Sequence, residues 1–419
     1  MAAPALHIAW LGAGPNAKET GGVPGVAAEL LAGFAALGHR VDCFLPVSGG
    51  ELPARLEAEP NLRFVRGSVE WRHSRWYSRG RLGTFLSGLF ARAVGSLRLR
   101  REVLRHHRQD PYDVVYQFSN IESLAMPGQL RGRVPLVIHP ETHIAGELRS
   151  LWRERRLALR CQPKHTVAIA AATMSVRSAV QRRRVRRASL LVCISSVFRD
   201  HIVSDYGFPR EKTVVVPNPI RFERFTEPHL DRPLGEPPTV LVLGRVSARK
   251  GVESVVEVAR ILHARGSRAR VRVVGGVTLE SDYRKLLEDL PSESSEYTGR
   301  MRPSDVPAEL AGADVMLQAA RYEPFGLTVA EALASGVPVV ATSEVGAIEG
   351  VARSVVAEVA PGDAAAMADE LERLLDALAA GAPALRATAR HEAERLFATG
   401  TVCARISREL QALVHGVGS

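Results

Sequence analysis

The sequence predicts an α/β protein made of two doubly wound domains that face each other across a central cleft. Short apolar runs with strand character alternate with stretches of helical periodicity, which is typical of a parallel sheet covered by helices. This alternation begins near residue 6 and begins again near residue 240, after a proline-rich stretch. The chain has 419 residues, which is long enough for two ordinary domains.

The first half opens with one strand–helix–strand unit. Residues 6–11 form an apolar run, residues 26–37 have helical periodicity that stops at Gly38, and residues 40–45 form the next strand. The remaining segments of this half are predicted by the same criteria. Further strands are expected at residues 113–116, 135–138 and 189–194, and Arg-rich, mostly helical segments at residues 69–108 and 144–188.

The second half repeats this alternation of strands and helices after a proline-rich break. A strand at residues 214–216 ends in a double-proline turn, and a polar stretch follows to Pro238, where the domains are expected to divide. Strands are then predicted at residues 240–244, 269–274, 314–317 and 336–341, and helices at 252–264 and 282–290. We therefore expect an N-terminal domain over 1–218, a C-terminal domain over 219–395, and a last helix over 396–419 that packs back on the first domain.

Charge is distributed unevenly. The formal net charge is +10, yet residues 1–218 hold 32 Lys and Arg against 17 Asp and Glu. Such a basic half either faces an anionic partner, such as lipid head groups or an acidic acceptor, or consists of solvated Arg faces. Aromatic residues make up 5% of the chain, which is few for base-stacking platforms and disfavours nucleic acid as the partner.

The four cysteines indicate the compartment. Cys43, Cys161, Cys193 and Cys403 form no CxxC pair and no zinc spacing, so they are expected to be buried thiols in a reducing environment. No signal peptide and no apolar run long enough to span a membrane is recognised. We expect a cytoplasmic protein, and peripheral contact with a membrane stays open.

The most informative segment runs from Glu323 through Pro-Phe-Gly-Leu to Glu331. The first carboxylate lies on a Pro/Gly loop, and the second lies about two turns into the helix that follows. Free backbone N–H groups at a helix start attract phosphate, and carboxylates accept sugar hydroxyls. The neighbours of Glu331 are small or apolar, so a solvated position is hard to arrange and a partner is expected.

This segment resembles the E-x7-E motif of retaining nucleotide-sugar glycosyltransferases of family 4, which have the GT-B fold of two Rossmann-like domains. The resemblance implies that Glu331 holds the ribose hydroxyls of the donor. It implies that Glu323, with the N–H groups of Phe325, Gly326 and Leu327, orients the transferred sugar. The later segment from Gly346 to Glu349 resembles the G-x-x-E that follows this motif.

Two further segments resemble parts of the same family. The run from Gly244 to Gly251 is similar to a strand-end element whose Arg and Lys, here Arg245 and Lys250, clamp the diphosphate. Fixed cations would stabilise the charge that grows on the leaving diphosphate. The stretch from Tyr297 to Met301 is similar to the loop that meets the nucleobase, and Val216-Pro-Asn218 is similar to the interdomain hinge.

The first domain supplies the other side of the expected cleft. Gly21 and Gly22 before a helix resemble the family's glycine loop, which approaches the donor phosphate and the acceptor. The family also places a histidine near the anomeric carbon. His139 or His143 could be its equivalent, with His139 favoured because it lies next to the strand end. The G-x-G-x-x-A match at residues 12–17 is a weak dinucleotide signal.

No Asp-x-Asp pair exists in the chain, so we expect no metal site and no cofactor, with a UDP- or GDP-sugar as the donor substrate. The reaction is expected to be retaining transfer of a hexose-type sugar to a lipid, a saccharide or a small molecule. The alternative is a basic nucleic-acid-binding protein or a non-catalytic sugar-binding protein on the same fold. Scarce aromatics disfavour the first and the diphosphate clamp disfavours the second.

Overall fold

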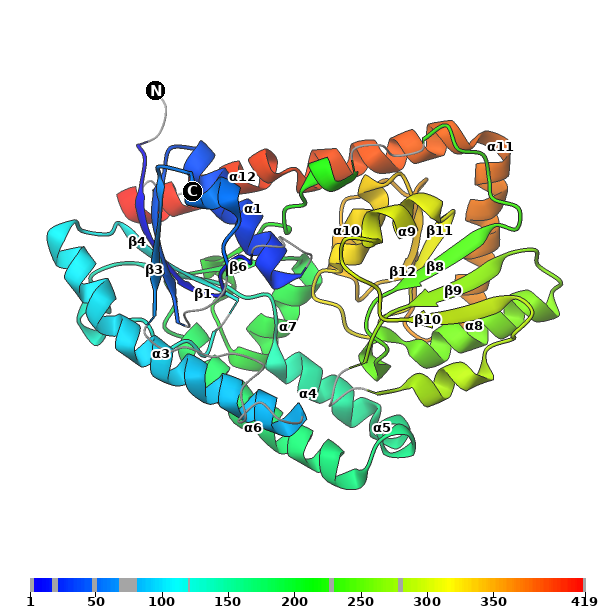
Figure 1. The fold of residues 1–419 in the computed structure, drawn as a ribbon, viewed down its shortest axis with the longest axis horizontal. Coiled ribbons are helices and arrows are strands. Elements are labelled where there is room, and N and C mark those ends of the chain that lie inside the picture. Colours follow the sequence, from blue (N-terminus) through cyan, green and yellow to red (C-terminus); the bar gives the residue numbers. More distant parts are fainter. Residues whose placement is uncertain are drawn as a thin grey trace.

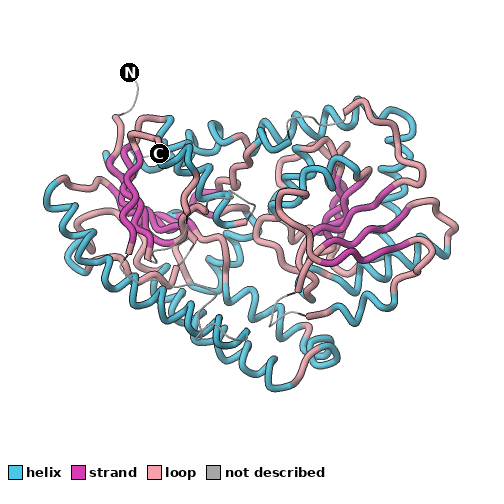
Figure 2. Tube along the Cα trace, in the orientation of Figure 1, coloured by secondary structure: helices cyan, strands magenta, loops and turns pink. Residues whose placement is uncertain are grey.

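The computed structural model of the chain describes residues 4–16, 22–46, 51–67, 81–119, 121–225, 230–277 and 282–416. Two parallel sheets, each with helices on both faces, lie side by side (Figures 1 and 2). The predicted α/β class with two doubly wound units is confirmed.

The first sheet has seven strands in the order β3-β2-β1-β4-β5-β6-β7. Its strands are β1 (His7–Gly12), β2 (Arg40–Leu45), β3 (Leu62–Arg66), β4 (Val114–Phe118), β5 (Leu136–His139), β6 (Leu190–Cys193) and β7 (Thr213–Val215). The order reverses between β1 and β4, which pair in parallel from Ile8 with Val114 onward. In such sheets, ligands bind outside the carboxyl ends of the strands at this reversal.

The side chains of β1 show why both faces of this sheet are covered. Because side chains alternate along a strand, Ile8 and Trp10 face one side while Ala9 and Leu11 face the other. The first pair packs with α1 (Val23–Ala36) and α12 (Thr399–His415), and the second packs with α3 (Arg81–Gln109). The other helices of this half are α2 (Ala54–Glu57), α4 (Ile144–Arg153), α5 (Arg155–Cys161), α6 (Lys164–Val185) and α7 (Ser196–Tyr206), with 3-10 helices η2 (Gly128–Leu130) and η3 (Arg210–Lys212).

The Arg-rich segments are helical where the structure describes them. Residues 81–109 form α3, and residues 144–185 form α4 to α6. Residues 69–80, the rest of the first predicted segment, lie outside the described residues.

The second sheet has six strands in the order β10-β9-β8-β11-β12-β13, the same winding as the first. Its strands are β8 (Thr239–Leu243), β9 (Arg270–Val274), β10 (Ser295–Gly299), β11 (Val315–Gln318), β12 (Val339–Thr342) and β13 (Val356–Val359). Its helices are α8 (Val252–Ala264), α9 (Val306–Gly312), α10 (Leu327–Ala334) and α11 (Ala364–Phe397), with η4 (Phe222–Phe225), η5 (Ala248–Lys250), η6 (Arg284–Asp289) and η7 (Gly346–Ile348).

One predicted helix differs from the observed element. Residues 282–290 were expected to be α-helical, but the structure has the short 3-10 helix η6 there. Pro291 follows at once, and a segment this short gains little from α-helical cooperativity.

The chain crosses between the two sheets at two adjacent points. The backbone N–H of Ile220 donates to the carbonyl of Phe397 at 2.9 Å, so the outgoing and returning segments pair. After α11, helix α12 lies beside α1 at the first sheet, and Val402, Cys403 and Ile406 enter the core of that half (Figure 1). Among the described residues, no helix is long and apolar enough to cross a bilayer.

Candidate functional site

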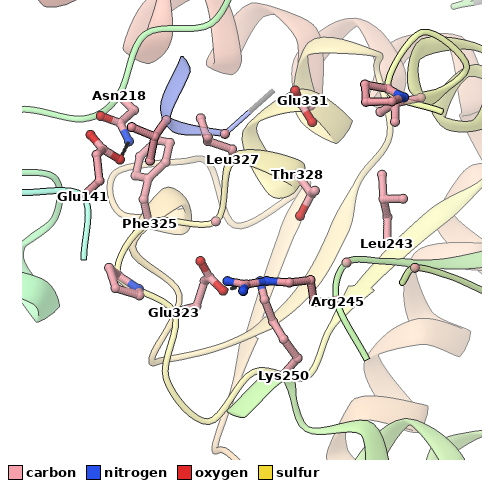
Figure 3. Close-up of a pocket in the computed structure, with 18 of the residues that line it drawn as sticks. Glu141, Asn218, Leu243, Arg245, Lys250, Glu323, Phe325, Leu327, Thr328 and Glu331 are labelled. Atoms are coloured by element: carbon pink, nitrogen blue, oxygen red, sulfur yellow. Dashed lines mark hydrogen bonds and ion pairs between the residues drawn. The ribbon is translucent and has the colours of Figure 1, made fainter. Parts of the chain in front are cut away.

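A cavity of about 440 Å³ lies where the two halves meet at the carboxyl ends of their strands. Nine of the site residues expected from the sequence line it: Gly22, Arg245, Lys250, Met301, Glu323, Phe325, Gly326, Leu327 and Glu331. Two of the expected residues, His139 and His143, do not line it, and Gly21 lies outside the described residues. In Figure 3, the side chains of Glu323, Arg245 and Lys250 converge at one end of the cavity and Glu331 lies at another.

The loop that carries Glu323 leads directly into α10. Gly326 precedes the helix with φ of 99°, a left-handed conformation that side chains with a Cβ rarely adopt. Phe325, Gly326 and Leu327 line the cavity at the start of this helix. The first N–H groups of a helix have no acceptor within it, so they are available to a ligand. Glu323 itself is held by its backbone N–H, which donates to the carbonyl of Glu344 at 3.2 Å.

The cations come from the turn between β8 and α8. Lys250 forms an ion pair with Glu323, and Arg249 Nη1 lies 3.2 Å from Glu323 Oε2. Burial raises the pKa of Glu323, but the charges of Lys250 and Arg249 outweigh burial and hold this pKa below its usual value. Arg245 lines the cavity beside them. Glu147 also lines the cavity near Arg249, so three cations face two carboxylates, which still leaves a net positive site that suits a phosphate-bearing ligand.

A glycine makes this turn possible. Gly251 has φ of 68°, and a Cβ built there would lie 1.9 Å from the carbonyl oxygen of Ala319. The backbone of η5 can therefore approach the end of β11 only with glycine at this position. The close approach places Arg249 and Lys250 over the loop that carries Glu323, and the N–H groups of Arg321 and Tyr322 donate to the carbonyl of Arg249.

Glu331 occupies a less charged part of the cavity. Its side chain is 10% exposed, and Arg224 Nη1 lies 3.6 Å from its Oε1. Burial raises the pKa of Glu331 to about 7, and Arg224 opposes that shift only in part. Because Arg224, the one cation paired with it among the described residues, lies 3.6 Å away, the carboxyl group of Glu331 can accept hydrogen bonds from the hydroxyl groups of a ligand.

The first half contributes seven residues to the cavity: Gly22, Val23, Glu141, Thr142, Glu147, Ile194 and Asn218. Asn218 Nδ2 donates to Glu141 Oε2 at 2.7 Å, and this pair is visible in Figure 3. Burial raises the pKa of Glu141 to about 7, against the opposing hydrogen bond from Asn218. Glu141 Oε1 and Asn218 Oδ1 are buried and have no hydrogen-bond partner within the described chain.

The expectation that His139 faces the cavity is corrected, because its side chain is fully buried. Its Nδ1 is hydrogen-bonded to the hydroxyl of Tyr116 at 2.5 Å, and its Nε2 lies 3.6 Å from Glu141 Oε1. Burial lowers the pKa of His139 to about 3. His139 ends β5 opposite Phe118 of β4, and its ring packs edge-on against that of Phe118. The carboxyl group of Glu141, two residues later in the chain, reaches the cavity instead.

His143 is also fully buried and lies at the junction of the two halves. Its Nδ1 is 2.9 Å from the hydroxyl of Tyr322, next to Glu323, and its Nε2 is 3.2 Å from Asp205 Oδ2. Asp205 in turn accepts two hydrogen bonds from Arg149. Burial, with the nearby charges of Arg149 and His201, lowers the pKa of His143 to about 3, so the neutral ring bridges Tyr322 and Asp205.

Further contacts tie α7 to the loop of Glu323. Ser195 Oγ donates to the carbonyl of Pro324 at 2.7 Å. The backbone N–H groups of Ser196 and Val197 donate to Glu349 at 2.8 and 3.0 Å. Glu349, which ends the predicted G-x-x-E segment, thus caps a helix of the other half and does not line the cavity.

Sequence reasoning missed Arg224, Arg249, Glu141 and Asn218 as site residues. Arg249 lies beside Lys250, and Glu141 lies between the two histidines, so both were within segments already singled out. Asn218 was noted only as part of the hinge. Arg224 had no local signal, because it meets Glu331 only through the crossing between the two halves.

The remaining expectations concern metals and dinucleotides. Within the described ranges, no three His, Cys, Asp or Glu side chains gather as metal ligands would. Gly12 and Gly14 of the weak dinucleotide match line a second cavity of about 490 Å³ in the first half, and Ala17 lies outside the described residues.

Two family models match the chain. The model of glycosyl transferase 4-like domains matches residues 21–219, and the model of glycosyl transferases group 1 matches residues 229–386. Together they include both walls of the cavity.

Curated relatives are similar over part of their length. Mannosylfructose-phosphate synthase of Agrobacterium fabrum is 28% identical over 38% of this chain and 38% of its own. Alpha-monoglucosyldiacylglycerol synthase of Streptococcus pneumoniae is 27% identical over 49% of this chain and 51% of its own. A GDP-mannose-dependent phosphatidylinositol monomannoside mannosyltransferase of Mycobacterium tuberculosis is 30% identical over 42% and 49%. The chain thus spans about half or less of the length of these relatives.

Solved structures match over nearly the whole chain. Sucrose-phosphate synthase of Thermosynechococcus elongatus has a TM-score of 0.69 at 20% identity, covering 98% of this chain and 100% of its own. HepE of Anabaena, in complex with UDP and glucose, has a TM-score of 0.60 at 20% identity, covering 97% and 100%. At this identity the likeness concerns the fold. With both family models matched on that fold, the chain belongs to the glycosyl transferases of group 1 and has the GT-B architecture.

Proposed function

We propose that this protein is a retaining, metal-independent glycosyltransferase that moves a hexose-type sugar from a nucleoside-diphosphate sugar to a hydroxyl acceptor. The observation that carries the proposal is one cavity that combines the cations Arg245, Arg249 and Lys250 with the carboxyl groups of Glu323 and Glu331. A nucleotide sugar has matching groups, because it joins an anionic diphosphate to the hydroxyls of a ribose and a sugar. A GDP-mannose-dependent relative and the UDP complex of HepE support this donor class.

The donor binds mainly to the second half. Arg245 and Lys250 hold the diphosphate, and the start of α10, where Gly326 and Leu327 line the same cavity, supplies backbone N–H groups to it. Glu331 accepts hydrogen bonds from the ribose hydroxyls, and Glu323 accepts hydrogen bonds from the hydroxyls of the transferred sugar. Glu323 is ionised through its contacts with Lys250 and Arg249, so it accepts hydrogen bonds strongly.

In the proposed reaction, the acceptor hydroxyl attacks the anomeric carbon on the face from which the diphosphate leaves. The bond between that carbon and the phosphate oxygen breaks, and its electron pair goes to the diphosphate. The departing phosphate takes the acceptor proton. The charge that grows on the diphosphate is stabilised by Arg245 and Lys250, which are already in place and need little reorganisation.

On the acceptor side, the cavity presents Glu141, held by Asn218. We assign Glu141 the contact with a substrate hydroxyl and His139 a positioning role behind it, since its Nε2 lies 3.6 Å from Glu141 Oε1. His143 acts as a positioning residue through Tyr322, the neighbour of Glu323. A lipid, a saccharide or a small molecule could each supply the acceptor hydroxyl. A cytoplasmic location, supported by four unpaired cysteines, remains part of the proposal.

Thermal-shift measurements with UDP-, GDP-, ADP- and TDP-sugars identify the donor. Ligand at about 100 times its Kd stabilises the protein by roughly 2.7 kcal/mol, and we expect one nucleotide to produce such a shift. Lys250→Ala and Glu323→Ala should then lower kcat by about 10²- to 10³-fold, the loss typical of one transition-state contact.

Lys285→Ala and Glu288→Ala are matched controls, because both side chains are exposed on η6 and away from the cavity. Wild-type turnover in both cavity variants would refute the site. A product with inverted anomeric configuration, seen by NMR, would refute the retaining reaction.

A further inference from the structure

Exposed apolar side chains are concentrated in one region of the molecule. Within the described ranges, eight large apolar side chains are exposed, and one of them, Leu37, lies just after α1. The other seven lie on α3, α4, α5 and α6: Phe90, Leu97, Trp152, Leu159, Ile169, Val176 and Val180. Figure 1 shows α4, α5 and α6 along the lower edge of the molecule, on the outside of both sheets.

Helix α6 carries the clearest part of this surface. Ile169, Val176 and Val180 are spaced seven and four residues apart, so they lie on one side of the helix. Their side chains are 51%, 67% and 38% exposed. Ala168, Ala172 and Ala179 are exposed beside them, and so is Ser175, whose hydroxyl donates to the carbonyl of Ala171 within the helix at 2.8 Å.

Charged groups are absent from the middle of this face. Between Thr166 and Val180 the sequence has one charged residue, Arg177, and its Nε donates to Glu122 Oε1 at 2.9 Å. The opposite side of α6 packs on α4 and α7. A helix that is apolar on the face away from its own protein is expected to bury that face against something else.

The ends of α6 and its neighbours are strongly basic. Lys164 opens the helix, and Arg182 and Arg183 are exposed near its end. Helix α3 has seven Arg and one acidic residue, Glu102. Residues 144–188 include twelve Lys and Arg and two acidic residues, Glu147 and Glu154. A second copy of the chain would bring the same positive charge against this face. An anionic lipid surface supplies the opposite charge and an apolar layer beneath it.

We propose that the face of α6 formed by Ile169, Val176 and Val180 docks the protein on an anionic membrane surface. The apolar side chains enter the boundary between head groups and acyl chains. Arg182 and Arg183 lie among the head groups, since long basic side chains reach outward from an apolar stem. This inference does not depend on the proposed glycosyl transfer, because the face lies outside the donor cavity.

Flotation with vesicles tests the proposal. We expect the purified protein to bind vesicles of phosphatidylcholine with phosphatidylglycerol at least ten times more strongly than vesicles of phosphatidylcholine alone. The double variant Val176→Asp/Val180→Asp should lose this binding by at least tenfold. Arg182→Glu/Arg183→Glu should lower binding to the anionic vesicles and weaken its dependence on salt. Leu37→Asp, an exposed apolar position elsewhere, is the matched control and should bind like wild type.

Equal binding to both kinds of vesicle, no binding, or wild-type binding by Val176→Asp/Val180→Asp would each overturn the proposal. A wild-type dimer that these substitutions dissociate in sedimentation experiments would assign the face to a second copy instead. Nucleotide-sugar binding, measured by thermal shift, should be unchanged in all the surface variants. Absence of that binding in the wild type would count against the proposed function and leave the vesicle result intact.

Discussion

Substitution of Glu349 gives a quantitative test of how the two halves are joined. Its carboxylate accepts hydrogen bonds from the N–H groups of Ser196 and Val197 at 2.8 and 3.0 Å, at the start of α7. These donors belong to the N-terminal turn of a helix, where an anion is also favoured by the helix dipole. Glu349 is therefore a helix cap that is supplied by the other half of the molecule.

The expected cost follows from these contacts. Loss of a cap costs about 0.5 to 2 kcal/mol, and loss of the charge near the dipole adds about 0.3 to 1 kcal/mol. Ser195 Oγ still accepts from the N–H of Phe198, so α7 is not left without any cap. We expect Glu349→Ala to destabilise the protein by about 2 kcal/mol. Glu349→Gln, which keeps one acceptor oxygen, should cost about 1 kcal/mol.

Differential scanning calorimetry measures this effect. For a domain of roughly 200 residues, 1 kcal/mol corresponds to about 2 to 4 °C in Tm, so Glu349→Ala should lower Tm by about 4 to 8 °C. Glu358→Ala is the control, because its ion pair with Arg353 lies at the surface and is worth about 0 to 1 kcal/mol. Nucleotide-sugar affinity should stay at the wild-type level. An unchanged Tm for Glu349→Ala, or a loss of donor affinity without a loss of stability, would refute the capping role.

Two more predictions concern a glycine and a buried carboxyl group. Gly251→Ala should destabilise the protein by about 2 kcal/mol or more and abolish donor binding, because its Cβ would meet the carbonyl of Ala319. Gly266→Ala has the same backbone strain, with φ of 69°, but open space around it, so it should cost only about 1 kcal/mol; equal melting temperatures for the two variants would refute the clash. Burial, and then Glu253, raise the pKa of Glu154 to about 7 from an ordinary 4.5, so the folded state holds the proton more tightly than the unfolded state. The stability that this proton provides is complete below about pH 4.5 and is lost as pH rises through 7, so Glu154→Gln should change the pH dependence of unfolding by about 3 kcal/mol over that range. Parallel curves of unfolding free energy against pH for the variant and the wild type would contradict this assignment.

The donor side of the cavity could be predicted because its residues are local in sequence. The loop and helix from Glu323 to Glu331 form one segment, and Lys250 lies in a single turn after a strand; the resemblance of both segments to family 4 implied their roles. In each case a strand end, a glycine and the next helix start decide where the side chains point. These are short-range rules, so each motif could be recognised within a few consecutive residues, and the family resemblance then implied what the residues bind.

The histidines show where such rules stop. His139 and His143 follow a strand end, and position alone favours a place in the cleft. Where each ring lies depends on the partners that it contacts in the folded chain. These are Tyr116 for His139, and Tyr322 with Asp205 for His143. Those partners are 23 to 179 residues away in the chain. The position of Glu141 in the cavity likewise depends on a distant partner, because Asn218 donates a hydrogen bond to its carboxyl group.

The sequence by itself determined the two doubly wound units, the strand ends that form the cavity, and the cluster of cations and carboxylates on the second half. Hydrophobic periodicity and turn residues act over a few positions, so they can be read without a structure. Only the tertiary structure decided which polar groups are buried together across the two halves, such as Glu349 with α7 and Arg224 with Glu331. It also decided that one face of α6 is left exposed, because burial depends on what packs against a helix and not on the helix alone.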